Sequence, residues 1–63
     1  MTYRELKQEN AAFKTWYIPR ICKAGTYRMH ATELSSGLRF AVERDNKLIE
    51  IWKKEGKKYE RVL

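Results

Sequence analysis

The side chains best suited to chemistry in this sequence are arginines and aromatic residues of its second half. Arg39, Trp52, Tyr59 and Arg61 belong to this group, and Arg28 precedes them. Arginine beside exposed rings is typical of single-stranded nucleic-acid binding, because bases stack on rings for about 1–3 kcal/mol each and guanidinium groups pair with phosphates. The same residue types are enriched at protein–protein interfaces and also form cation–π ladders within one chain. All three uses are therefore open.

A second group of charged side chains lies close to the C-terminus. Four lysines flank a turn signal at residues 55–56: Lys53, Lys54, Lys57 and Lys58. A lysine-rich hairpin tip binds phosphates through charge and does not read bases. Lysines at the tips and edges of sheets also prevent aggregation between sheets, so protection of the edge is an equally good interpretation.

The one histidine, His30, raises the question of catalysis. Together with Glu43 and Arg28 it would supply the groups that acid–base cleavage of an RNA phosphodiester needs. A chain of this size frames no deep pocket, and a single histidine on a small sheet is more often a surface residue. We therefore predict that the protein is not an enzyme, and keep a small ribonuclease as a distant third function.

Neither a metal site nor a cofactor site is indicated. One cysteine, Cys22, and one histidine do not make a structural zinc site, which needs four ligands. The three glycines all fall in predicted turns, and no phosphate-binding loop or nucleotide fingerprint occurs. A single thiol cannot form a disulfide within the chain, so we expect Cys22 to be a small buried apolar residue.

The net charge of +6 on 63 residues favours a polyanionic partner. We expect either nucleic acid, with single strands favoured, or an acidic protein; charge kept for solubility alone is the remaining interpretation. No apolar stretch approaches the roughly 18 residues of a transmembrane helix, so no membrane partner is expected. The lone thiol and the absence of a signal-peptide pattern predict a cytoplasmic location.

These side chains must be positioned by a helix and several strands. Residues 2–13 are predicted to be helical, with Thr2 and Glu5 as a capping box. The β-type runs that follow are residues 15–22, 26–34, 38–44, 47–54 and 57–62, separated by turn residues. We predict a single α+β domain over residues 1–63. It consists of a short N-terminal helix and a curved antiparallel meander of four to five strands, with an SH3-like or Sm-like open barrel as one form of that sheet.

Two-residue loops at residues 24–25, 36–37, 45–46 and 55–56 set the predicted register and divide the side chains between two faces. One face is apolar and, covered by Leu6 and Phe13 of the helix, is the predicted core: Trp16, Ile18, Met29, Ala31, Leu38, Phe40, Val42, Ile49, Ile51 and Val62. The opposite face carries the candidate binding residues: Tyr17, Arg28, His30, Arg39, Trp52, Tyr59 and Arg61. In this register Arg39, Trp52 and Tyr59 form one continuous row, and His30 faces Glu43.

The function predicted from these features is a small nucleic-acid-binding module or regulator. Arg39, Trp52, Tyr59 and Arg61 would form its stacking platform, and the four lysines would contact phosphate. The alternative is a protein-interaction module, such as an inhibitor or accessory subunit, that uses the same face. Because a chain this small needs a well-packed core or a second copy to be stable, we also favour a homodimer.

Overall fold

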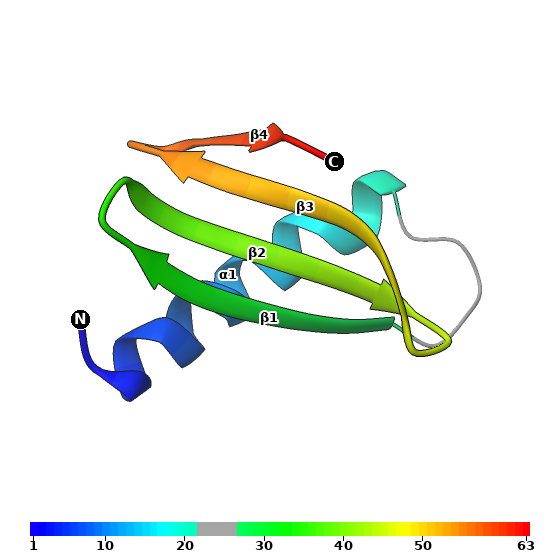
Figure 1. The fold of residues 1–63 in the computed structure, drawn as a ribbon, viewed down its shortest axis with the longest axis horizontal. Coiled ribbons are helices and arrows are strands. Elements are labelled where there is room, and N and C mark those ends of the chain that lie inside the picture. Colours follow the sequence, from blue (N-terminus) through cyan, green and yellow to red (C-terminus); the bar gives the residue numbers. More distant parts are fainter. Residues whose placement is uncertain (22–26) are drawn as a thin grey trace.

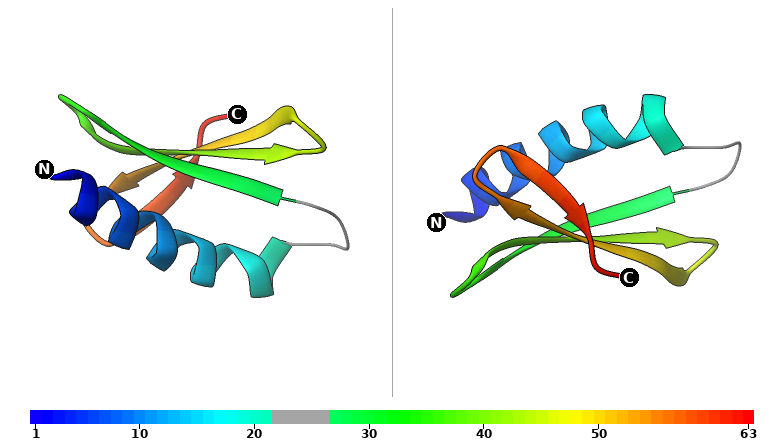
Figure 2. Two further views of the ribbon diagram at one scale, coloured as in Figure 1. Left: turned by 90° about the horizontal axis from the view of Figure 1, so that it is seen from below. Right: turned by 90° about the horizontal axis from the view of Figure 1, so that it is seen from above.

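The chain folds into one helix followed by four antiparallel strands (Figure 1). The computed structural model describes residues 1–21 and 27–63. Its elements are α1 (Tyr3–Ile21), β1 (Tyr27–Leu34), β2 (Gly37–Arg44), β3 (Lys47–Glu55) and β4 (Lys58–Arg61). The strands form an open sheet in the order β1-β2-β3-β4, and α1 lies across one face of it (Figure 2). This architecture confirms the predicted α+β class.

Helix α1 begins at the predicted cap but continues well beyond residue 13. The backbone N–H of Glu5 donates to Thr2 Oγ1 at 3.2 Å, which is the N-terminal half of a capping box. The predicted strand at residues 15–22 is wrong over residues 15–21, because Phe13, Trp16 and Tyr17 fall on one helical face and pack on the sheet. Their burial outweighs the strand preference of aromatic residues.

Pro19 does not prevent this continuation because it lies in the last turn of α1. There a proline removes one intrahelical hydrogen bond, the one to the carbonyl of Thr15, and little helix follows that it could disrupt. Cys22 and the predicted loop at residues 24–25 lie outside the described residues.

The turn at Asp45-Asn46 is confirmed, whereas the other two described turns are displaced by one residue. Both Asp45 and Asn46 have positive φ, 51° and 65°, as a tight hairpin loop of this type requires. The β1–β2 loop is residues 35–36 rather than 36–37, and the β3–β4 loop is residues 56–57 rather than 55–56. Each displacement moves the pairing by two residues, which leaves the faces of the paired strands unchanged.

The structure has a β-bulge in β3 that the predicted register lacks, and this bulge changes which residues lie on each face of the sheet. Val42 pairs with Glu50 while Glu43 pairs with Leu48, so Ile49 is an additional residue between the two pairs. One additional residue exchanges the two faces of the rest of the strand. Phe40 therefore faces Trp52 instead of Ile51, and β4, whose register follows β3, is exchanged with it.

The core lies between α1 and the sheet and is mainly aromatic. Its buried apolar residues are Phe13, Tyr17, Met29, Phe40, Val42 and Trp52. Phe13 stacks on Phe40 with ring centroids 4.5 Å apart, and Trp16 meets Trp52 edge-on at 5.2 Å.

The predicted core face is therefore partly right. Met29, Phe40 and Val42 are buried as predicted, and four further predicted residues pack around them: Trp16, Ala31, Leu38 and Ile49. Ile18 and Val62 are exposed, and Ile51 lies on the opposite face. These three are corrections that follow from the longer helix and from the bulge.

Candidate interaction surface on the uncovered face of the sheet

The predicted row of Arg39, Trp52 and Tyr59 does not form. Arg39 pairs with Lys53, whereas Trp52 pairs with Phe40 and points toward α1. Trp52 is only 9% exposed, and Tyr59 packs edge-on against Phe13 at 5.2 Å. Trp52 therefore belongs to the core, and Tyr59 is partly buried against it, so the two rings do not form an open stacking platform. The bulge is the physical reason, because it turns these rings inward.

Two more residues predicted for the binding face lie instead between α1 and the sheet, Tyr17 on α1 and Arg61 on the inner face of β4. Tyr17 is buried, and its hydroxyl donates to Glu50 Oε2 at 3.0 Å. Arg61 lies 3.8 Å from Glu50 Oε1 and donates from Nε to the carbonyl of Leu63 at 2.9 Å. Both side chains therefore contribute to holding the fold together.

Glu50 is the residue that sequence reasoning missed. Its carboxylate is 7% exposed and accepts hydrogen bonds from the Tyr17 hydroxyl and, at 2.8 Å, from Trp52 Nε1. The predicted register had a two-residue loop and no bulge, and it therefore placed Glu50 on the opposite face, beside solvent. A carboxylate inside the apolar run of residues 48–52 is the one signal that pointed to a special environment.

The opposite face of the sheet, here called the outer face, is not covered by α1 (Figure 2). Alternation along the strands, with the observed register, assigns its residues. They are Arg28, His30, Thr32, Leu34, Arg39, Ala41, Glu43, Leu48, Ile51, Lys53, Glu55, Lys58, Glu60 and Val62. None of these is Phe, Tyr or Trp, so within the described residues the imidazole of His30 is the one ring that this face offers for stacking.

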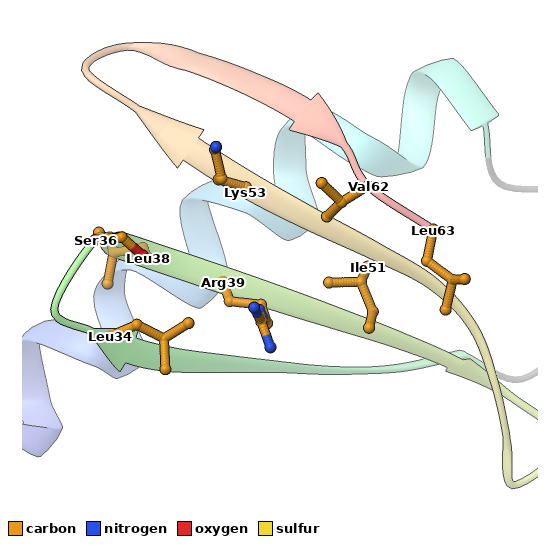
Figure 3. Close-up of a pocket in the computed structure, with 9 residues that line it drawn as sticks. Leu34, Ser36, Leu38, Arg39, Ile51, Lys53, Val62 and Leu63 are labelled. Carbon is orange, nitrogen blue, oxygen red and sulfur yellow. The ribbon is translucent and has the colours of Figure 1, made fainter.

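A hollow of about 310 Å³, lined by both apolar and polar side chains, lies on the outer face (Figure 3). Ile51 contributes to it from β3, Leu34 from the end of β1, and Val62 and Leu63 from the segment after β4. The backbone N–H of Val62 donates to the carbonyl of Ile51 at 2.8 Å, which fixes that segment beside β3. Leu34 is 36% exposed, and Val62 and Leu63 are each 56% exposed. Several apolar side chains thus gather on a face that solvent reaches.

Two cations lie beside the hollow and face each other across β2 and β3. Arg39 and Lys53 are direct partners in the register and both line the hollow. Lys53 forms an ion pair with Glu55 at 2.7 Å, and this hydrogen bond, with the negative charge of Glu55 and more weakly of Glu60, raises the pKa of Lys53. Arg39 has no ion pair within residues 1–21 and 27–63.

The remaining predicted lysines point in different directions. Lys54 Nζ donates to Glu9 Oε2 of α1 at 2.8 Å, and this hydrogen bond raises the pKa of Lys54. Lys57 and Lys58 lie at the exposed β3–β4 turn and make no ion pair with the part of the chain that the structure describes. The hairpin is therefore not a single cluster of four free cations.

The predicted contact between His30 and Glu43 is confirmed, with His30 Nε2 and Glu43 Oε2 2.7 Å apart. It joins diagonal positions, because His30 pairs with Ala41 and Arg28 pairs with Glu43. Both side chains lie on the open outer face, away from the hollow. Among the described residues, no three histidine, cysteine or acidic side chains form a group that would hold a metal ion.

The one helix that the structure describes is not apolar enough to cross a membrane. Comparisons of the chain with protein-family models, with curated proteins and with solved structures found no match.

Proposed function

We propose that this protein is an interaction module that binds an acidic protein through the outer face of its sheet. The observation that carries the proposal is the hollow on the face that α1 leaves uncovered. Leu34, Ile51 and Val62 contribute apolar groups to its lining, Arg39 lies between Leu34 and Ile51, and Lys53 lines the hollow as well (Figure 3). Contiguous exposed apolar groups on a small protein mark contact sites, because leaving them in water is unfavourable.

The composition of the hollow resembles the centre of a protein–protein interface. Such centres are apolar, with arginine enriched and most other charged residues displaced to the rim. Arg39 fits this pattern, while Glu55, Lys58 and Glu60 lie toward the β3–β4 turn as a polar rim. The net charge of +6 favours an acidic partner and increases the rate of association with it.

Nucleic-acid binding is the second candidate, supported by the cations that form no ion pair within residues 1–21 and 27–63. Arg28 and Arg39 on the outer face, with Lys57 and Lys58 at the turn, are available to contact phosphates. In this form of the hypothesis binding depends mainly on charge, because Trp52 is in the core and Tyr59 is partly buried against it. It would show little base specificity.

Site-specific photo-crosslinking tests the proposal and separates the two candidates. A benzoylphenylalanine placed at Thr32 reports on the outer face, and one at Lys14 reports on the exposed side of α1 as a matched control. After irradiation in lysate of the source cells, we expect a discrete protein adduct from position 32 and none from position 14. An adduct that nuclease removes would support the second candidate. Equal adducts from both positions, or none, would refute binding through the outer face.

A further inference from the structure

We infer that the hollow receives an aliphatic side chain of the acidic partner and that Arg39 pairs with a carboxylate next to that side chain. The inference rests on the proposed function and specifies the chemistry that the outer face recognises. The partner segment is thus a leucine-like residue flanked by aspartate or glutamate.

The lining of the hollow fits an aliphatic side chain. Leu34 and Ile51 approach it from β1 and β3, and Val62 and Leu63 from the segment after β4 (Figure 3). Gly37, directly opposite Leu34 in the register, lines the hollow without contributing a side chain. An aliphatic group placed here would remove apolar surface of both molecules from water.

The two cations that line the hollow, Arg39 and Lys53, differ in whether a carboxylate lies beside them. Like charges directly opposite each other across a sheet destabilise it unless an anion lies near. Glu55 supplies that anion for Lys53 at 2.7 Å, but Arg39 has none within the described parts of the chain. A guanidinium binds a carboxylate through two parallel hydrogen bonds, so a partner carboxylate would complete the pairing that the sheet leaves incomplete.

The positive charge of the protein favours an acidic partner segment in the hollow over a second copy of the chain. Each copy carries a net charge of +6, and the outer face that two copies would have to bring together holds four cations, Arg28, Arg39, Lys53 and Lys58, against three carboxylates, Glu43, Glu55 and Glu60. Repulsion between like charges opposes such an interface, whereas an acidic segment gains from the same charges. The apolar lining also disfavours a nucleic-acid backbone, which offers no aliphatic group to fill the hollow.

Fluorescence anisotropy of a labelled peptide tests the inference with the full chain. The probe is a short acidic peptide with one leucine between glutamates, and two matched peptides replace either the leucine by asparagine or the flanking glutamates by glutamine. Arg39→Gln should weaken binding of the first peptide by about tenfold or more, the effect of one charge-assisted pair. Arg28→Gln removes the same charge from the same face away from the hollow, and should weaken binding by less than about threefold.

The outcomes separate this inference from the function on which it rests. Loss of binding with either altered peptide and with Leu34→Ser, in variants that unfold at the same urea concentration as the wild type, would support it. Equal effects of Arg39→Gln and Arg28→Gln would overturn it, because binding would then depend on overall charge alone. If the leucine peptide does not bind while position 32 still crosslinks to a protein, the recognition chemistry is wrong and the proposed function stands.

Discussion

Glu50 is the residue on which the polar part of the core depends. Tyr17 of α1 and Trp52 of β3 both donate to its carboxylate, so one side chain links the helix to the sheet. Replacing it by leucine removes the acceptor of both hydrogen bonds, and losing the acceptor of a buried donor costs about 1–3 kcal/mol. We expect Glu50→Leu to lower the free energy of unfolding by about 2–4 kcal/mol in urea titrations.

Two matched variants define what this loss means. Glu50→Gln retains one acceptor oxygen and should lose less stability than Glu50→Leu. Glu60→Gln changes an exposed carboxylate and should stay within about 0.5 kcal/mol of the wild type. If Glu50→Leu were as stable as Glu60→Gln, the hydrogen bonds to Glu50 would contribute nothing to the fold.

At the scale of single residues, the sequence predicts burial well where local alternation decides it. Met29, Phe40 and Val42 alternate along β1 and β2 and are buried as predicted. Trp52 and Tyr59 were assigned to the wrong face, because the additional residue Ile49 precedes them in the sheet. No local property of residues 48–50 distinguishes a bulge from a regular strand, so the error lies in the register and not in the residue types.

At the scale of elements, Glu9 and Lys54 connect α1 to β3. Their ion pair, with Lys54 Nζ 2.8 Å from Glu9 Oε2, raises the pKa of Lys54 above its ordinary value of 10.5. A raised lysine pKa means that the stabilisation is fully present below the ordinary value and is lost as pH rises through the folded-state pKa. A double-mutant cycle with Glu9→Gln and Lys54→Gln should give a coupling of about 0.5–1 kcal/mol near neutral pH.

The same double-mutant cycle, measured at alkaline pH, tests whether the coupling depends on charge. The coupling should decline once the pH exceeds the raised pKa of Lys54, because the lysine then loses the positive charge that Glu9 attracts. A coupling that persisted unchanged beyond that point would mean that the two side chains interact through packing rather than through charge.

The edge strand β1 gives a second test at this scale. Leu34 and Gly37 flank a two-residue loop, so Leu34 and Thr32 direct their backbone groups to β2, and Ala31 directs its own to the free edge. Because proline lacks the backbone N–H, Thr32→Pro should destabilise the protein by about 1–3 kcal/mol more than Ala31→Pro. The free energies of unfolding of the two variants check the observed register. If Ala31→Pro were the more destabilising change, the pairing of β1 with β2 would be shifted by one residue.

Helix α1 shows why element boundaries were harder to predict than elements. Residues 15–21 have the aromatic and β-branched composition of a strand, and Pro19 argues against the interior of a helix. The helical spacing of Phe13, Trp16 and Tyr17 favours the opposite conclusion, but it decides the matter only when a sheet is present to bury the rings. Tertiary packing, which local propensity does not contain, therefore sets the length of the helix.

For the whole molecule, one face of the sheet stabilises the fold and the other carries the proposed binding surface. Aromatic residues from α1 and all four strands meet on the inner face, and the outer face has smaller apolar groups and cations, of which Arg28 and Arg39 have no ion pair within the described residues. The α+β class and the order of helix and strands could be predicted from turn signals and composition. The face that carries the proposed binding surface could not be predicted, because one bulge exchanges the two faces of both β3 and β4.

The stability of the whole fold depends on docking of the helix, and Phe13 is its central contact. Phe13 is fully buried and meets Phe40 at 4.5 Å and Tyr59 at 5.2 Å. Phenylalanine-to-alanine changes in cores cost about 3–5 kcal/mol, which is a large part of the 5–15 kcal/mol that stabilises a typical domain. Because a small sheet cannot bury its inner face alone, we expect Phe13→Ala to unfold helix and sheet together, with loss of the near-ultraviolet circular dichroism of both tryptophans.

Tyr3→Ala is the matched control, because Tyr3 is an aromatic residue of the same helix that is 80% exposed. It should change the free energy of unfolding by less than about 0.5 kcal/mol. Phe13→Leu retains most of the apolar volume and should lie between the two variants. If Phe13→Ala lost only the helical signal while the tryptophan signal persisted, the sheet would be stable without α1, and the inner face would then be available to partners as well as the outer one.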